Sequence, residues 1–301
     1  MRPRFGSLLV LAFPVLALGG LALGGLAACA AHGVGGADPS LRVMTYNVRY
    51  GTADDGLDAW EHRRELALRV ISNNEPDVIG VQEALRFQLD EIAAAFPRLA
   101  EVGVGRDDGD EAGEYSAILY DENRLELLDS DTFWLSGTPE VVASTNWGNR
   151  IPRIVTWARF RDRRTERTFY VFNTHWDHES QPSRERSAVL LLERIAAREH
   201  PGEPVLLTGD FNAGESNPAF VALLEGELTD TFRALHPDAT DVGTFHGFEG
   251  DRSGEKIDAI LASPGWRVRE AWLVTDQEGG RYPSDHFPVM AVASLAESAG
   301  S

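Results

Sequence analysis

Cysteine is almost absent from this chain of 301 residues, since Cys29 is its only one. A single thiol cannot form an intrachain disulfide, so the stability of the fold must come from packing. Lysine is equally scarce: Lys256 stands alone, and the other basic side chains are arginines. The remaining composition, 43% hydrophobic and 25% charged residues, is ordinary for a soluble globular protein with a full core.

Positive charge is also in deficit. The chain has 28 Lys and Arg against 47 Asp and Glu, which gives a formal net charge of −19 at pH 7. A field of this sign repels phosphate backbones unless a local basic patch overrides it. The composition therefore disfavours nucleic acid as a partner, although a metal site could still bind a nucleic acid.

The N-terminal segment, residues 1–28, has the three-part pattern of a secretory signal. Arg2 and Arg4 precede an apolar region that extends from residue 8 to residue 26, and small residues follow. Pro14 and the glycine pairs of this region argue against a stable membrane-spanning helix. The pattern predicts an exported protein.

Cys29 ends the segment Leu26-Ala27-Ala28-Cys29, which resembles the lipobox of bacterial lipoproteins. On that hypothesis Cys29 is lipidated and anchors the protein to a membrane of the cell envelope, on its periplasmic or extracellular face. The alternatives are an ordinary cleavage site that contains a cysteine and an uncleaved anchor. Residues 30–40, with glycines and a proline, are expected to form a short flexible tether.

From residue 41 onward, strand and helix signals alternate without an internal repeat or a second composition regime. One mixed α/β domain, residues 41–296, is the economical interpretation. The predicted strands are 41–48, 77–82, 115–120, 125–135, 154–160, 168–174, 203–209, 257–261, 268–275 and 287–293. The predicted helices are 60–73, 87–96, 182–198 and 217–224.

Polar side chains stand at the ends of several predicted strands. In the clearest case an apolar run ends at Asp210 and Asn212, a carboxylate and a carboxamide that point the same way because they are two residues apart. Such a pair can orient a water and take its proton, provided that a cation and a polarised electrophile lie opposite. The pattern recurs at Asn47, Glu83, Asn173, His175, Asp177, His178, Asp258, Asp285 and His286.

Each of these residues has a structural explanation when it is taken alone. Asn47 could cap a turn, Glu83 could open the helix that follows, and Asp258 could be a surface carboxylate. His175 could be a satisfied surface histidine, and Asp285 could be a cap. The recurrence of the pattern at strand after strand is what favours a functional interpretation.

Together these stretches resemble the endonuclease/exonuclease/phosphatase superfamily over about residues 41–294. The matching segments are Met44-Thr45-Tyr46-Asn47, Val81-Gln82-Glu83, Asn173-Thr174-His175, Gly209-Asp210-Phe211-Asn212, Ile257-Asp258 and Ser284-Asp285-His286-Phe287-Pro288. Each motif alone is weak, but the ordered set is specific. The resemblance implies a four-layer αββα sandwich of two packed mixed sheets, and this agrees with the predicted strands and helices. It also implies hydrolysis of phosphate esters with a divalent cation, usually Mg²⁺, with Mn²⁺ as an alternative.

The resemblance assigns a role to each matching residue. Glu83 would be the principal metal ligand, with Asn47 and Asp285 near the ion, because hard oxygen ligands suit Mg²⁺. Asp210, helped by Asn212, would orient or deprotonate the attacking water.

The resemblance places the two histidines at the phosphate. His286, held in one tautomer by Asp258, would stabilise the charge that develops on the phosphoryl oxygens. His175 would contact the phosphate from the other side, as a donor or as a general acid for the leaving oxygen. We therefore expect direct in-line attack by water. Ser284 is rejected as a nucleophile because it lacks the nucleophile-elbow pattern.

An aromatic and cationic stretch is predicted to contact the substrate. Trp147 and Trp176, with Trp134 and with Arg150 and Arg153, could form an aromatic wall with cationic tips beside the phosphate. Core packing is the alternative for the tryptophans.

The histidine motif supplies further candidates. Asn173 is predicted to bind substrate. Asp177 and His178 depart from the nuclease versions of the motif, and they could bind a second metal, orient His175 or be solvated loop residues.

These observations predict a Mg²⁺-dependent phosphoesterase that acts as a monomer, more specifically a phosphodiesterase for a small organic phosphate or a lipid headgroup. An extracellular nuclease is the alternative, disfavoured by the acidic balance and the single lysine. A catalytically inactive binding module is disfavoured because every matching position holds a chemically competent residue type.

Overall fold

The computed structural model describes residues 39–296. The predictions for residues 1–28, for Cys29 and for most of the tether 30–40 lie outside the described residues. Within residues 39–296, no helix combines the length and the apolar character needed to cross a membrane.

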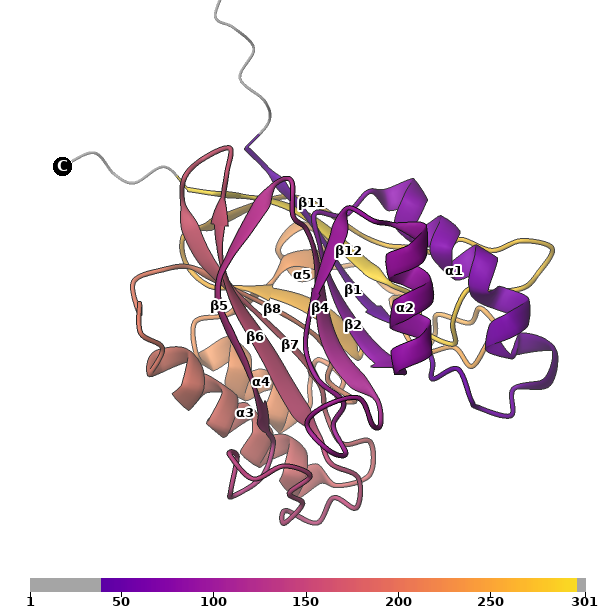
Figure 1. Cartoon of the computed structure of the whole chain (residues 1–301), viewed down its shortest axis with the longest axis horizontal. Helices are drawn as coiled ribbons and strands as arrows, with labels where there is room; N and C mark the ends of the chain where they lie inside the picture. The colour runs from indigo at the N-terminus through magenta and orange to yellow at the C-terminus, as the bar shows by residue number, and fades with distance from the viewer. Residues whose placement is uncertain (1–38, 297–301) are drawn as a thin grey trace, which may run out of the picture. The chain divides into compact units, whose positions relative to one another are not determined.

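Twelve strands of the described chain form two mixed sheets of six strands each (Figure 1). The first contains β1 (Leu41–Asn47), β2 (Val78–Ala84), β3 (Leu99–Val102), β4 (Tyr115–Asp121), β11 (Trp266–Leu273) and β12 (Val289–Leu295), in the order β11-β12-β1-β2-β4-β3. The second contains β5 (Leu125–Trp134), β6 (Ile154–Asp162), β7 (Thr168–His175), β8 (Val205–Asp210), β9 (Thr229–Asp230) and β10 (Asp258–Ala262), in the order β5-β6-β7-β8-β10-β9. The pairs β1/β2 and β7/β8 are parallel, and the other pairs are antiparallel.

Helices cover the outer face of each sheet (Figure 1). The helices α1 (Trp60–Asn74) and α2 (Arg86–Ala95) pack on the first sheet, and α3 (Gln181–Ala196) and α4 (Pro218–Glu225) pack on the second. A short helix, α5 (Thr231–Leu235), follows β9. The predicted four-layer αββα sandwich is therefore confirmed.

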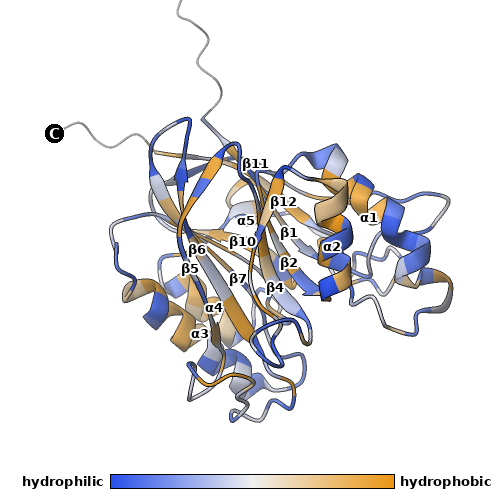
Figure 2. Ribbon diagram, in the orientation of Figure 1, coloured by the Kyte–Doolittle hydropathy of each residue, from blue (hydrophilic) through white to orange (hydrophobic). Residues whose placement is uncertain are grey.

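Period-two alternation along the strands builds these layers. In β1, Val43 belongs to the apolar cluster between the sheets, whereas Met44 belongs to the cluster under α1 and α2. Figure 2 shows that α1 carries both polar and apolar residues, as expected of a helix with one buried side.

The predicted elements are all present, with boundaries displaced by a few residues. β12 begins at Val289 instead of Phe287; the intervening Pro288 has no N–H to donate to a strand ladder. The elements β3, β9 and α5 were not predicted from the sequence, because they are two to five residues long and too short to show a period.

Candidate active site

The polar strand ends meet at one edge of the sandwich. The carboxyl ends of parallel neighbours lie at the same edge, which brings Asn47 to Glu83 and His175 to Asp210. β10 is antiparallel to β8, and its first residue, Asp258, lies opposite Asp210. Because β12 is antiparallel to β1, the residues that precede it arrive at this edge as well.

A pocket of about 480 Å³ opens at this edge. Predicted site residues that line it are Glu83, Arg153, His175, Asp210, Asn212, Asp285 and His286. Asn47 and Asp258 are each 1% exposed and contact these residues through hydrogen bonds. Most of the residues predicted to act in catalysis or metal binding therefore meet at this one pocket.

Glu83 reaches the pocket from a β-bulge. The register between β2 and β4 shifts between Gln82 and Ala84, and Glu83 has a positive φ of 64°. Bulges re-aim side chains next to active sites, and a positive φ on a residue other than glycine costs on the order of 1 kcal/mol. Asn47 Nδ2 donates to Glu83 Oε1 (3.0 Å), and Tyr50 N–H donates to Oε2 (3.1 Å), so both carboxylate oxygens are held.

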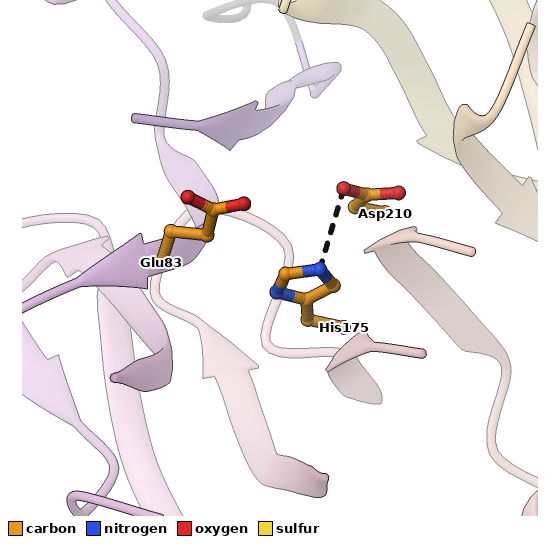
Figure 3. A group of neighbouring side chains, drawn as sticks. All are labelled: Glu83, His175 and Asp210. Atoms are coloured by element: carbon orange, nitrogen blue, oxygen red, sulfur yellow. Dashed lines mark ion pairs between the residues drawn. The ribbon is translucent and has the colours of Figure 1, made fainter. Parts of the chain in front are cut away.

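Asp210 lies between the two histidines. Its Oδ1 accepts a hydrogen bond from Asn212 N–H (2.9 Å), and its Oδ2 accepts one from Asn47 Nδ2 (2.9 Å). Oδ2 is also 3.5 Å from His175 Nε2 and 3.8 Å from His286 Nε2. Figure 3 marks the first of these ion pairs with a dashed line. Burial, and next the charge of Asp258, raise the pKa of Asp210 to about 7. This carboxylate is therefore poised to accept a proton near neutral pH.

Asn47 differs in one respect from its predicted role near the ion. Its Oδ1 accepts a hydrogen bond from Arg49 N–H (2.9 Å), and its Nδ2 faces Glu83, Asp210 and His286 Nε2 (3.5 Å). In this arrangement Asn47 donates to the carboxylates and holds them together, and it does not offer its oxygen to a cation.

His286 and Asp258 form the predicted pair. His286 Nδ1 is 2.9 Å from Asp258 Oδ2, and both residues are buried. Burial lowers the pKa of His286, but the charges of Asp258 and Asp210 outweigh it and raise this pKa well above the usual value. The ring therefore carries a proton on Nδ1 toward Asp258 and presents Nε2 on the side of Asp210.

His175 has the opposite electrostatic environment. Burial, with the charges of Arg153 and Arg106, lowers the pKa of His175 well below its usual value. Its Nδ1 lies 3.9 Å from Glu114 Oε2 and has no hydrogen-bond partner within residues 39–296. The two imidazoles thus favour opposite protonation states on either side of Asp210.

Asp285 and Ser284 close the site from the loop before β12. Asp285 lines the pocket with its Oδ2 3.7 Å from Arg49 Nε, and burial raises its pKa. Ser284 is fully buried, and its hydroxyl donates to Asn47 O (2.7 Å). A serine held in this way is structural, in keeping with its rejection as a nucleophile.

The donor set fits a divalent cation. One ligand atom each from Glu83, His175 and Asp210 lie within 4.8 Å of one another, and Figure 3 shows these three side chains grouped together. A second group has one ligand atom from each residue within the same 4.8 Å, and it consists of Asp210, Asp258 and His286. The raised pKa values of Asp210 and Asp285 indicate buried negative charge that a cation would compensate.

Several further pocket residues were not predicted, among them Arg106, Glu114 and Phe245. Arg106 forms a bidentate ion pair with Glu114 (2.7 and 2.6 Å), and burial raises the pKa of Glu114 to about 7. Phe245 is 51% exposed, and its ring stands 5.1 Å from that of His286. These residues lie in loops, and the acidic, glycine-rich segment around Arg106 has the composition of an ordinary solvated turn.

The residues predicted to contact substrate that lie outside the pocket lining are Asn173, Trp176, Trp147, Trp134 and Arg150. Trp134 is 5% exposed, and Arg150 is paired with Glu179 on the surface. Asn173 is fully buried between the sheets, where its Nδ2 donates to Val81 O and Ala117 O. Trp176 is fully buried in the core under α3 and α4, edge-on to Phe211. Trp147 is partly buried and packs against the same core. Asn173, Trp176 and Trp147 are therefore packing residues in this structure. Asn173 and Trp176 belong to the segment of the histidine motif, which alternates between interior layers, whereas Trp147 lies in the loop before β6.

Asp177 and His178 take roles that were not foreseen. Asp177 is 2% exposed, accepts hydrogen bonds from Glu179 N–H and Ser180 N–H, and lies 3.6 Å from Arg153 Nε. His178 lines the pocket, with Nδ1 2.9 Å from Arg153 Nη2. Both residues hold Arg153.

Comparison with known proteins agrees with this geometry. The profile of the endonuclease/exonuclease/phosphatase family matches residues 44–286. The chain belongs to this family. Its members are phosphoesterases, and the chain is a phosphoric ester hydrolase, as predicted.

Solved structures of the family resemble the chain over nearly their full length. A family protein from Bacteroides vulgatus is 34% identical, with a TM-score of 0.79, and the match covers 85% of this chain and 99% of that one. A mannosyl-6-phosphatase from Bacteroides thetaiotaomicron is 33% identical, with a TM-score of 0.78 and coverage of 85% and 100%. Protein angel from Drosophila melanogaster is 28% identical over 275 residues, or 79% of this chain and 73% of that protein.

Proposed function

We propose that this family member is a Mg²⁺- or Mn²⁺-dependent hydrolase of a small organic phosphate ester, and that water attacks the phosphorus in line. The observation that carries the proposal is the convergence of Glu83, His175, Asp210 and His286 on one pocket. When bound at Glu83, the cation would neutralise phosphoryl oxygens and polarise the phosphorus.

Asp210 orients the attacking water and accepts its proton. Asn47 and the backbone N–H of Asn212 hold the two carboxylate oxygens, so the base has a fixed orientation. The pKa of Asp210, about 7, is close to neutral pH and therefore suits a base that takes a proton from water.

The histidines act on the phosphoryl group and on the leaving oxygen. His286, kept protonated by Asp258, donates from Nε2 to the oxygens that gain charge in the transition state. His175 contacts the phosphate from the side of Glu114 and Arg153. No covalent enzyme intermediate is required.

The pocket favours a small substrate. Its volume of about 480 Å³ accommodates one small ligand, and exposed Phe245 supplies an apolar face for the organic portion. The similarity to a mannosyl-6-phosphatase supports a sugar phosphate or a compound of similar size.

Replacing Glu83 by Gln tests the proposal, because it preserves size and removes the ligand charge. We expect Mg²⁺-dependent turnover of p-nitrophenyl phosphate, bis-p-nitrophenyl phosphate or sugar phosphates to fall by more than about 100-fold. Glu122→Gln, at an exposed position, serves as the matched control. Undiminished metal-dependent hydrolysis by the Glu83 variant would show that the site is assigned wrongly. Salt-sensitive cleavage of DNA or RNA, with no turnover of small esters, would favour a nuclease.

We further propose export and lipid attachment at Cys29, on the sequence pattern of residues 1–29. Fractionation of cells that express the full chain is the test. Wild-type protein is expected in the membrane fraction and the Cys29→Ser variant outside it. Equal distribution of the two would contradict lipidation.

A further inference from the structure

Arg153 is a buried cation with unused hydrogen-bonding capacity in the pocket wall. It directly precedes β6, is 3% exposed and lines the pocket beside His175 and His178. Its Nη2 is bonded to His178 Nδ1, whereas Nε and Nη1 have no hydrogen-bond partner among the residues that the structure describes. A guanidinium has five N–H donors and no acceptor, so an acceptor is missing at this wall.

The groups around Arg153 fix it in place. Asp177, itself buried, lies 3.6 Å from Nε, which balances the charge without the geometry of a hydrogen bond. Because the arginine can only donate, His178 accepts its hydrogen bond at Nδ1. The side chain is thus positioned before any ligand arrives.

A second arginine strengthens the cationic character of this wall. Arg106 is 8% exposed, and its two terminal nitrogens are bonded to Glu114. Its Nε is buried without a hydrogen-bond partner in residues 39–296 and lies 4.0 Å from Asp107 Oδ1. The wall next to His175 therefore offers buried N–H donors, whereas Glu83, Asp210 and Asp285 supply carboxylates to the same pocket. A phosphoryl group placed in the pocket would meet the cation site and the arginine wall with different oxygens.

We infer that Arg153 makes the pocket selective for the terminal phosphate of a monoester over the phosphate of a diester. This inference rests on the proposed function. A monoester dianion has three non-bridging oxygens, and the third can accept from the unused donors of Arg153. In a diester the third oxygen is bonded to a second organic group. An ester oxygen of this kind is a poor hydrogen-bond acceptor, and its carbon substituent would lie against the buried guanidinium. This inference differs from the sequence-based expectation of a phosphodiesterase, and the experiment below decides between the two.

The reaction balances without a further reactant. The water oxygen forms a new bond to phosphorus as the bond between phosphorus and the ester oxygen breaks. One water proton is taken up by Asp210, and the leaving oxygen gains a proton, so the products are an alcohol and inorganic phosphate. Arg153 takes no part in the proton transfer.

The test compares p-nitrophenyl phosphate with bis-p-nitrophenyl phosphate, which share a leaving group, on the Mg²⁺-loaded protein. We expect wild-type kcat/KM to favour the monoester. Arg153→Met, which keeps the aliphatic stem, should lower kcat/KM for the monoester about 100-fold and that for the diester less than about 5-fold, because only the monoester loses a donor. The control is Arg150→Met, since Arg150 is paired with Glu179 on the surface and its side chain is 84% exposed. It should leave both rates unchanged.

Arg153→Lys addresses the case in which the methionine variant does not fold. It keeps the charge and loses the planar fork, so it should lower the monoester rate selectively and weaken competitive inhibition by inorganic phosphate. A wild-type preference for the diester, or an equal loss of both activities in either variant, would overturn the inference and leave the proposed function standing. Absence of metal-dependent hydrolysis of both esters by the folded wild-type protein would overturn the proposed function itself.

Discussion

We predict that Asp258 acts through His286, and that replacing Asp258 by Asn isolates this action. The carboxylate is 1% exposed and bonded to His286 Nδ1 at 2.9 Å, so the change removes a charge while nearly preserving volume. His286 should then lose the interaction that raises its pKa and holds one ring orientation. Burial, which lowers the pKa of His286, would no longer be opposed by Asp258.

The size of the effect follows from the type of bond removed. A buried hydrogen bond to a charged group is worth about 1.5–3 kcal/mol, and about 1.4 kcal/mol corresponds to a factor of ten in rate. Asp258→Asn should therefore lower kcat about 10- to 150-fold. KM should change little, because the buried carboxylate acts on the ring and not on the substrate.

Steady-state kinetics with Mg²⁺ at neutral pH measure both quantities, with circular dichroism as a check on folding. Asp251→Asn is the control, because Asp251 lies in the same part of the chain and is exposed. An Asp258→Asn enzyme with kcat within twofold of wild type, or with only its KM altered, would refute the role of the pair.

Two further predictions concern stability. Asn173→Ala should lower the free energy of unfolding by about 3–4 kcal/mol, and Tm by roughly 10 °C. The reason is that it leaves the buried Val81 and Ala117 carbonyls without their hydrogen-bond donor. A loss of kcat/KM at unchanged Tm would instead show that Asn173 binds substrate, as the sequence predicted. Burial, with a smaller contribution from the charge of His286, lowers the pKa of His246 to about 4, so its contribution to stability is complete above about pH 6.5 and is lost as the pH falls toward 4. Urea unfolding measures the free energy of unfolding of wild type and of His246→Gln at pH 7 and pH 4.5. The stability difference between the two proteins should be smaller at pH 4.5 by about 1–2 kcal/mol, since partial solvent screening reduces the full effect. A stability difference that does not vary with pH would contradict this.

The sequence predicted the fold and the residues that converge on the pocket, because both depend on strand ends. Glu83, His175 and Asp210 each end a strand or stand in its last residues, and parallel pairing brings such positions together whatever the intervening loops do. Asp258 was predicted at the same site, and it lies there because β10 begins opposite Asp210.

The errors have an equally local origin. Asn173 and His175 lie on the same face of β7, but two residues along a strand is about 6.6 Å, which separates the interior between the sheets from the open edge. At Gly80 the facing sheet is so near that an added Cβ would lie 2.6 Å from Asn173 Oδ1. Trp176 follows His175 and points to the opposite side of the sheet, where it packs in the core under α3 and α4.

Arg106 and Glu114 could not have been found in the same way. They lie between β3 and β4, and their pairing depends on a loop conformation for which the sequence offers no periodic signal. Arg150 and Arg153 were indistinguishable in the sequence, yet one is exposed and the other is buried in the pocket wall.

The catalytic contacts bridge the seam between the two sheets. Asn47 and His286 belong to the first sheet and its approach, whereas Asp210 and Asp258 belong to the second, so the bonds Asn47–Asp210 and His286–Asp258 both cross it. Sliding one sheet past the other by a single strand residue, about 3.3 Å, would break both bonds while every strand kept its own ladder. Turnover therefore depends on the packing of one sheet against the other as well as on the pocket residues themselves.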